Sequence, residues 1–244
     1  MEIGLTSRMQ KQCKITKLPE SSQENLFYSW DVNIDKYKNR NVLYIANANN
    51  RLGCIICGMK PCVYKNVTEY VTKWIRELLL LQGYTETEVA EYMKKAGEPQ
   101  LTKTHGSKAI GAMNQTFSDF VWTDQEIDGS EELQVQISIW INKVLGKSAG
   151  YNDGYYYPCE TFMQDMEKAG IEVEQAKYVM INRITEDDYN CEEQLEGKSL
   201  KAKCFVVSQD GKIREWMRIP KRVLAENGLD EGSKVAKDIV EKYR

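Results

Sequence analysis

The sequence predicts an α+β fold, in which an antiparallel sheet is backed by helices and followed by a C-terminal module of a β-hairpin plus helix. Three observations predict this. Short β-type runs joined by short connectors fill residues 1 to 60, segments with apolar residues at helical spacing follow between 67 and 170, and strand alternation returns around an Asp-Gly turn near residue 210.

The opening part of the chain reads as strands. Ile3 and Leu5 suggest a short first strand, and the aromatic run 26–30 a second. Residues 42–46 and 54–57 follow, separated by an Asn-rich turn over 47–51. These closely spaced runs predict an antiparallel meander, and we expect the sheet to comprise residues 1 to 60 and 100 to 104.

Helices follow this meander. Apolar residues from Val67 to Leu79 recur at helical spacing, and Gly83 is a suitable stop. Thr85 to Glu88 reads as a capping box that opens a second helix ending at Gly97. After an extended piece at Leu101, a third helix begins at Ser107. We expect the helices of 67–82 and 107–121 to back the sheet, with Trp74 and Leu78 buried against it.

The apolar residues from 131 to 145 fit both a strand pattern and a helix pattern. Alternation of Val135, Ile137, Ile139 and Ile141 fits a strand, whereas the spacing of Leu133, Ile137, Trp140, Ile141 and Val144 fits a helix. The length of the segment favours the helix. Residues 151–157 then read as a loop, and Pro158 opens another helix that ends at Gly170.

Composition shifts near Glu174, and this shift predicts a domain of residues 1–174 followed by a module of residues 175–244. In the second part, 178–181 reads as a strand, and the runs 202–207 and 213–219 flank the Asp-Gly turn of a hairpin. Two helical segments are expected to close the chain, the second covering 235–243.

Composition bounds the function. The chain has 244 residues, 42% hydrophobic and 28% charged, and its net charge of −3 provides no global positive field for nucleic acid or anionic lipid. Its longest apolar stretch, 78–81, is far shorter than the ~20 residues that cross a bilayer, so no membrane contact is expected. The first residues lack the apolar run of a signal peptide, and the seven cysteines form an odd number; both predict a cytoplasmic protein with reduced thiols.

Short motifs in the first 150 residues resemble an uncharacterised bacterial family, a domain of unknown function. They are Asn25-Leu26-Phe27, the strand 42–47, and Leu101-Thr102-Lys103-Thr104 followed by Gly111-Ala112-Met113-Asn114. The family pattern continues after Thr-Lys-Thr with Asn-Asn-Arg-Ser, where this chain has His105, Gly106, Ser107 and Lys108. The place of that arginine is therefore Ser107 here, with Lys108 as a displaced substitute.

A second resemblance lies at 218–224, continuing over 228–235. This part is similar to the swapped-hairpin DNA-binding domain of transition-state regulators and some antitoxins, where Ile-Pro-Lys opens a helix and a Gly-Leu-x-Glu-Gly segment leads into a strand. The resemblance implies a nucleic-acid partner, which the sequence as a whole does not favour. Chance similarity of a strand-Pro-helix turn is the alternative, because 235–243 reads as helical here.

One segment is singled out as a binding site for a small anionic ligand. It runs from an extended piece into a helix, so free backbone N–H groups and the positive helix end lie among cationic and hydroxyl side chains. The candidate residues are Thr102, Lys103, Thr104, His105, Ser107 and Lys108. The alternative is a capped helix with solvated charges.

No catalytic residue, metal site or cofactor is predicted. Cys54 and Cys57 form a Cys-x-x-Cys, but the two isoleucines between them favour a buried strand in which the thiols act as small hydrophobic groups. His105 is the only imidazole in the chain, and no nucleophile motif accompanies it.

The alternation of 213–219 suggests a partner surface formed by Arg214, Trp216 and Arg218, suited to a protein partner or to self-association. The alternative is that Trp216 packs on the N-terminal domain. The sequence thus favours a non-enzymatic binding or regulatory protein. The alternatives are a phosphate- or nucleotide-handling enzyme that uses residues 102–108, and a DNA-binding regulator acting through the C-terminal module.

Overall fold

The computed structural model describes residues 1–122, 127–129, 131–173, 178–180, 201–207, 213–220 and 234–236. The chain divides into two compact units, one formed by Met1–Leu79 with Glu86–Val173 and the other by Leu80–Thr85 with Glu174–Arg244. Whether these units correspond to independently folding domains, as composition predicts for 1–174 and 175–244, stays a prediction.

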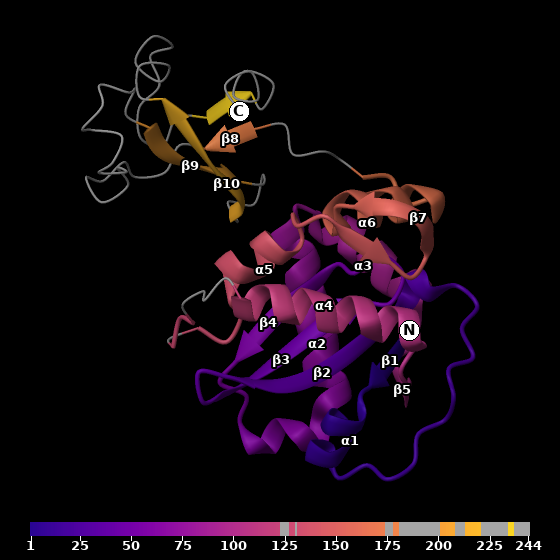
Figure 1. Cartoon of the computed structure of the whole chain (residues 1–244). Coiled ribbons are helices and arrows are strands. Elements are labelled where there is room, and N and C mark those ends of the chain that lie inside the picture. Colours follow the sequence, from indigo (N-terminus) through magenta and orange to yellow (C-terminus); the bar gives the residue numbers. More distant parts are fainter. Residues whose placement is uncertain are drawn as a thin grey trace. The chain divides into compact units, whose positions relative to one another are not determined.

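A five-stranded sheet is the centre of the first unit (Figure 1). Its strands are β1 (Glu2–Leu5), β2 (Ser29–Tyr37), β3 (Arg40–Asn47), β4 (Gly53–Cys57) and β5 (Gln100–Lys103), in the order β4-β3-β2-β1-β5. The α+β fold is confirmed, and β2, β3 and β4 form the expected antiparallel meander. However, β1 pairs in parallel with both β2 and β5, so the sheet is mixed.

Long connections explain the parallel pairs, because a parallel strand must be reached by a crossover. Between β1 and β2 lies α1 (Ser7–Cys13), a short helix that the sequence analysis did not predict. The Thr6 side chain caps it by accepting a hydrogen bond from the Met9 backbone N–H. The 3-10 turn η1 (Leu26–Tyr28), capped by Asn25, then precedes β2, which therefore begins at Ser29 rather than Leu26.

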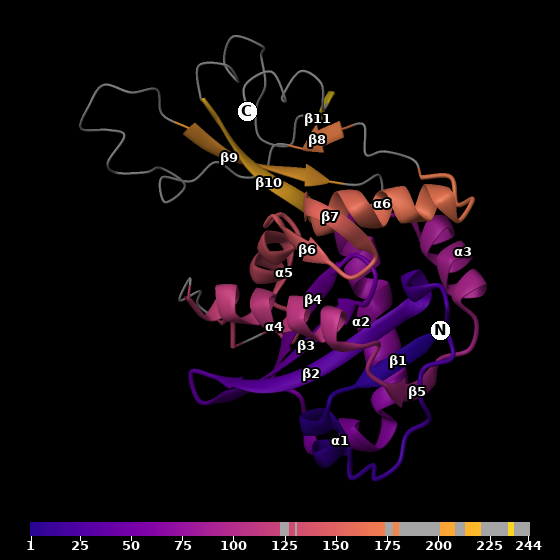
Figure 2. The ribbon, with the colours of Figure 1, turned by 45° about the vertical axis from the view of Figure 1, so that its right-hand side comes forward.

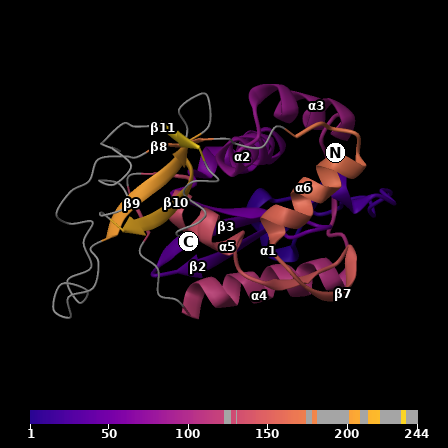
Figure 3. The ribbon, with the colours of Figure 1, turned by 90° about the horizontal axis from the view of Figure 1, so that it is seen from above.

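Helices cover both faces of the sheet. After η2 (Pro61–Asn66), the chain forms α2 (Val67–Gln82), α3 (Glu86–Ala96) and, beyond β5, α4 (Ser107–Trp122). Figure 3 shows α2 and α4 on opposite sides of the strands. Trp74 and Leu78 are buried, as expected.

The core beneath α4 is apolar along the β3–β4 side of the sheet. Residues of β2, β3 and β4 pack there against α4 and α5 (Val135–Ile141). The helix α5 settles the ambiguity of 131–145 in favour of the helix that the length of the segment predicted, and it places Ile137 and Ile141, one turn apart, on this core. The buried members are Tyr37, Val42, Tyr44, Ala46, Ile55, Cys57, Met113, Phe120, Ile137 and Ile141.

A two-stranded sheet follows, formed by β6 (Gly146–Ser148) and β7 (Tyr151–Tyr156), and α6 (Pro158–Lys168) completes the unit. Figure 2 shows β7 next to α6. The expectation of a loop over 151–157 was wrong, because the β propensity of the tyrosines outweighs the turn-like Asn-Asp-Gly between them. Gly154 accommodates the positive φ of 107° that the backbone adopts within this strand.

The second unit contains β8 (Tyr178–Met180), β9 (Lys201–Val207), β10 (Ile213–Pro220) and β11 (Lys234–Ala236), in the order β10-β9-β8-β11. The predicted hairpin is present as the antiparallel pair β9–β10. The helix expected from Val235 is wrong at its start, because Val235 pairs with Val179 in β11, where β-branched residues fit well. The remainder of that helix lies outside the described residues. In the described part of the chain, we find no helix with the length and apolarity needed to span a membrane.

Candidate functional site

The segment between β5 and α4 turns His105 into the protein interior. Gly106, with a φ of 99°, provides the turn, and its carbonyl accepts a hydrogen bond from Ile110 at 3.2 Å as α4 begins. The backbone N–H of His105 donates to Asp31 Oδ1 at 3.2 Å. The histidine is thereby tied to the middle of the sheet rather than displayed at the helix end.

The imidazole of His105 lies between two carboxylates. Its Nδ1 is 2.9 Å from Asp31 Oδ1, and its Nε2 is 3.2 Å from Glu2 Oε2. The side chain of His105 is fully buried, and those of Glu2 and Asp31 are only 6% and 2% exposed. We call these three residues the histidine cluster.

Strand register explains why the histidine cluster can form. Gly4 of β1 lies opposite both Asp31 of β2 and Thr102 of β5. A Cβ atom at Gly4 would lie 2.2 Å from Asp31 Oδ1 and 3.0 Å from His105 Nδ1. Because Gly4 has no side chain, the Asp31 carboxylate and the His105 imidazole can occupy the space where a Cβ atom would lie.

The charges of the cluster shift the pKa values in opposite directions. Burial lowers the pKa of His105, but the hydrogen bonds and charges of Asp31 and Glu2 outweigh it, and the net pKa is raised. Burial raises the pKa of Glu2, but hydrogen bonding from Ser21, Ser22 and His105 lowers it to about 2. Both shifts favour an imidazolium beside an ionised Glu2.

The predicted anion-site residues are distributed as follows. Thr102 is buried, and its hydroxyl has no hydrogen-bond partner among the described residues. Lys103 is exposed and forms an ion pair with Glu20, Thr104 is half-buried, and Ser107 and Lys108 are exposed. The structure thus brings His105 together with Glu2 and Asp31.

Sequence reasoning missed Glu2 and Asp31. A signal was present, because each is an acidic residue within a short β-type run: Glu2 precedes Ile3, and Asp31 stands between Trp30 and Val32. An acid on a central strand is seldom buried without a partner, so the pair could have been matched to the chain's single histidine.

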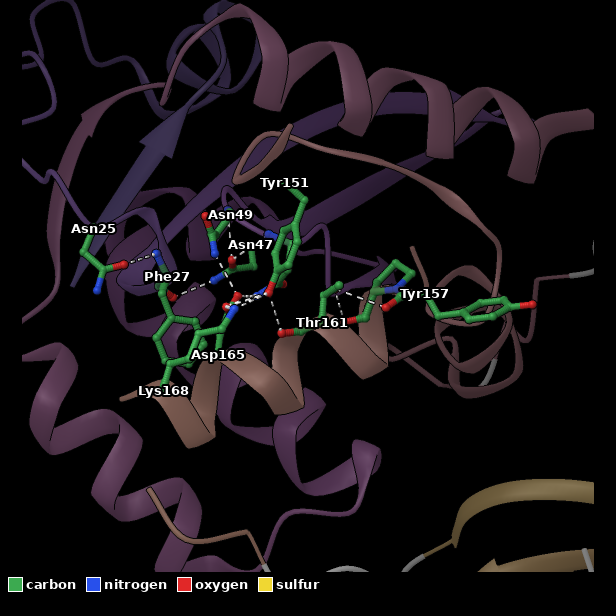
Figure 4. Close-up of polar contacts among 11 residues, drawn as sticks. Asn25, Phe27, Asn47, Asn49, Tyr151, Tyr157, Thr161, Asp165 and Lys168 are labelled. Carbon is green, nitrogen blue, oxygen red and sulfur yellow. Dashed lines mark hydrogen bonds and ion pairs between the residues drawn. The ribbon is translucent and has the colours of Figure 1, made fainter. Parts of the chain in front are cut away.

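A second polar network holds the turn of residues 47–51, between β3 and β4 (Figure 4). Asn47 Oδ1 accepts hydrogen bonds from the backbone of Asn49 at 3.0 Å and of Asn50 at 3.3 Å. Both of their side-chain amides donate to Asp165 Oδ2, at 2.7 and 2.9 Å. Tyr151 donates to the other oxygen of Asp165 at 2.7 Å. The turn is therefore fixed from within and from α6.

The last residue of this turn is Arg51, which is 5% exposed and adopts a φ of 70°. Its guanidinium donates to the Thr116 hydroxyl of α4 and, at 3.2 Å, to the carbonyl of Lys147. Gly146 packs against it so closely that a Cβ there would lie 1.3 Å from Nη1. An arginine is thus inserted between α4 and the β6–β7 hairpin.

The Cys-x-x-Cys lies in β4, with both thiols buried. Because side chains alternate along a strand, Cys54 and Cys57 point to opposite faces of the sheet. Burial raises the pKa of Cys57 to about 11, so its thiolate is disfavoured. Within the described residues, no group of three or more His, Cys, Asp or Glu side chains could hold a metal ion.

The residues of the predicted partner surface fall in β10, where Trp216 pairs with Phe205 of β9. The register shifts between Ile213 and Glu215, so the strict alternation expected along 213–219 is interrupted at Arg214. The exposure of the Arg214, Trp216 and Arg218 side chains lies outside what the structure describes.

These features define an α+β protein with a mixed sheet and a buried charged cluster in its N-terminal unit. The model of a family described as a domain of unknown function, DUF6933, matches residues 2–161, and the chain belongs to this family. No curated protein matches the chain. The resemblance to an uncharacterised family is therefore confirmed, whereas the resemblance of 218–235 to antitoxin domains stays a prediction.

Proposed function

We propose that this protein is a non-enzymatic binding or regulatory protein. The observation that supports the proposal is the position of the chain's only imidazole, which is fully buried and held on both nitrogens by carboxylates. A general acid or base must come within hydrogen-bond reach of a substrate. A buried histidine whose two ring nitrogens both contact carboxylates suits a role in stabilising the junction of β1, β2 and β5.

A panel of hydrolase, nuclease and transferase assays tests this proposal, using the wild type, His105→Ala, Lys103→Ala and the matched surface control Lys94→Ala. We expect no turnover specific to the wild type. We also expect His105→Ala alone to lower the melting temperature. Turnover that either His105→Ala or Lys103→Ala abolishes, while the variant keeps a cooperative unfolding transition, would refute the proposal.

The phosphate- or nucleotide-handling enzyme is the rival proposal. The exposure of Ser107 and Lys108 at the start of α4 supports it, since the first N–H groups of a 16-residue helix favour anions. The ion pair of Lys103 with Glu20 and the inward imidazole weigh against it. Nucleotide soaks of crystals distinguish the two, because ligand density at 102–108 supports the rival and density elsewhere does not.

A DNA-binding role for the C-terminal module is favoured by one observation. The resemblance of 218–235 requires a strand after its Gly-Leu-x-Glu-Gly segment, and β11 begins at Lys234, two residues after Gly232. Fluorescence anisotropy with a labelled DNA duplex at 50 and 200 mM salt tests the proposal. Binding that falls with salt and is weakened by Lys221→Ala with Arg222→Ala would support it, and no binding at low salt would exclude it.

Self-association or a protein partner through Arg214, Trp216 and Arg218 is the remaining proposal for this module. Light scattering of the wild type and Trp216→Ala tests the self-association. A wild-type dimer that Trp216→Ala converts to a monomer supports the surface, and identical masses for both proteins exclude self-association through it.

A further inference from the structure

Arg51 is a buried cation beside α4 for which the described residues provide no anionic partner. Arg51 is 5% exposed, yet among the described residues no carboxylate forms an ion pair with it. Its Nη atoms donate to the neutral oxygens of Thr116 and Lys147, and its Nε has no hydrogen-bond partner among those residues. An uncompensated buried charge costs several kcal/mol, so such an arginine calls for an anion.

Tyr44 provides a second donor beside Arg51. It is 1% exposed, and its hydroxyl also lacks a hydrogen-bond partner among the described residues. Burial raises the pKa of Tyr44 to about 12, while the nearby charge of Arg51 and the hydroxyl of Thr116 partly offset this. The phenol therefore keeps its proton at neutral pH and can donate it to a hydrogen bond.

Thr116 connects the two groups. Its hydroxyl accepts from Arg51 and donates to the Ala112 carbonyl at 3.1 Å, and it is also close enough to lower the pKa of Tyr44. Asp119 has the weakest of the named influences on the pKa of Tyr44, and it accepts a hydrogen bond from Gln115 at 2.8 Å. The cluster of Arg51, Tyr44 and Thr116 thus combines one positive charge with two donors that have no acceptor among the described residues.

The position of Arg51 is fixed before any ligand arrives. Asp165 and Asn47 hold the turn that carries it, and its left-handed backbone is stabilised by the hydrogen bond from Arg51 N to Asn47 O at 3.0 Å. A non-glycine residue with positive φ stores strain, which persists only where the surroundings impose it. Such preorganisation lowers the entropic cost of binding.

We propose that Arg51 Nε and the Tyr44 hydroxyl bind a small oxyanion between α4 and the sheet. The donor set fits this class because a guanidinium N–H and a phenol O–H both donate hydrogen bonds that oxyanions accept. The site is separate from the segment 102–108, and it does not depend on the function proposed above. An oxyanion there would neutralise the buried guanidinium and join β3 to α4.

Thermal unfolding with inorganic phosphate as the probe tests the proposal, at constant ionic strength maintained with sodium chloride. We expect phosphate at a hundredfold excess over its Kd to raise the melting temperature of the wild type by about 5 to 10 °C. Arg51→Met should abolish this shift, and Tyr44→Phe should reduce it. The matched control is Arg8→Met, because Arg8 is an exposed arginine on the same unit.

The control separates binding from the general stabilisation that phosphate gives by exclusion from protein surfaces. A shift in the wild type and Arg8→Met that exceeds the shift in Arg51→Met supports the site. Equal shifts in all proteins overturn it, and so does no shift in the wild type. Tyr44→Phe keeps the test decisive if Arg51→Met fails to fold, since a phosphate response of Tyr44→Phe equal to that of the wild type also overturns the proposal.

Discussion

The histidine cluster predicts a stability profile with a maximum in mildly acidic solution. Glu2 has an ordinary pKa of 4.5 that folding lowers to about 2. A group with a lowered pKa stabilises the folded state above its unfolded pKa, and this contribution is lost as the pH falls from 4.5 toward 2. The pKa of His105 is raised above 6.5, so its contribution is fully present below pH 6.5 and is lost as the pH rises through the folded value.

The magnitude follows from the shift of Glu2. Each pKa unit corresponds to about 1.4 kcal/mol, so lowering the pKa from 4.5 to about 2 corresponds to about 3 kcal/mol of unfolding free energy. Glu2→Gln removes this titration and keeps an oxygen that can accept from Ser22. The variant should therefore lose less stability than the wild type between pH 4.5 and 2.5.

Urea unfolding of both proteins at pH 2.5, 4.5, 6 and 8 measures the difference directly, because other carboxylates contribute equally to each. A wild type and a Glu2→Gln variant with parallel acid profiles would show that Glu2 is not stabilised by the cluster. NMR titration of the single imidazole checks the other limb, and an ordinary or lowered His105 pKa would contradict the arrangement.

Four further predictions concern packing. Leu78→Ala should cost about 2 to 5 kcal/mol of unfolding free energy in urea titrations, whereas Leu145→Ala at a half-exposed position should change it by less than about 0.5 kcal/mol. Gly4→Ala should destabilise by about 1 to 3 kcal/mol, because its Cβ would lie 2.2 Å from Asp31 Oδ1; a fully stable variant would contradict the close approach. Asp165→Ala should cost at least about 2 kcal/mol, measured by the same titration, because the Asn49 and Asn50 side-chain amides lose their acceptor and the Tyr151 hydroxyl keeps only the Thr161 carbonyl. Ellman's reagent should label Cys54 and Cys57 only after unfolding, and rapid labelling of either in the native state would contradict their burial.

Much of the fold could be predicted because it is encoded locally. Apolar residues at helical spacing place α2, and the glycine and asparagine turns delimit β3 and β4. Similarly, Pro158 marks the start of α6. Each of these signals acts within a few residues of the element that it defines.

Pairing partners were harder to predict, since they depend on residues far apart in the sequence. Nothing near Ile3 indicates that β1 pairs in parallel with β5, and α1 is too short to show a helical period. The segment 102–108 was singled out from its residue types. The partners of its histidine, however, are 103 and 74 residues away, so its orientation could not be predicted from local patterns.

The position of β1 between β2 and β5 in the sheet has a kinetic consequence. This strand pairs with β2 on one side, but its other side waits for β5, which is synthesised about 95 residues later. Contacts of such long range are slow to form because loop closure precedes any gain in energy. During synthesis, one edge of β1 and the acidic groups of Glu2 and Asp31 therefore stay uncovered until residues 100–105 arrive. We expect a chain truncated before β5 to be a client of chaperones, whereas a chain truncated after α6 should fold.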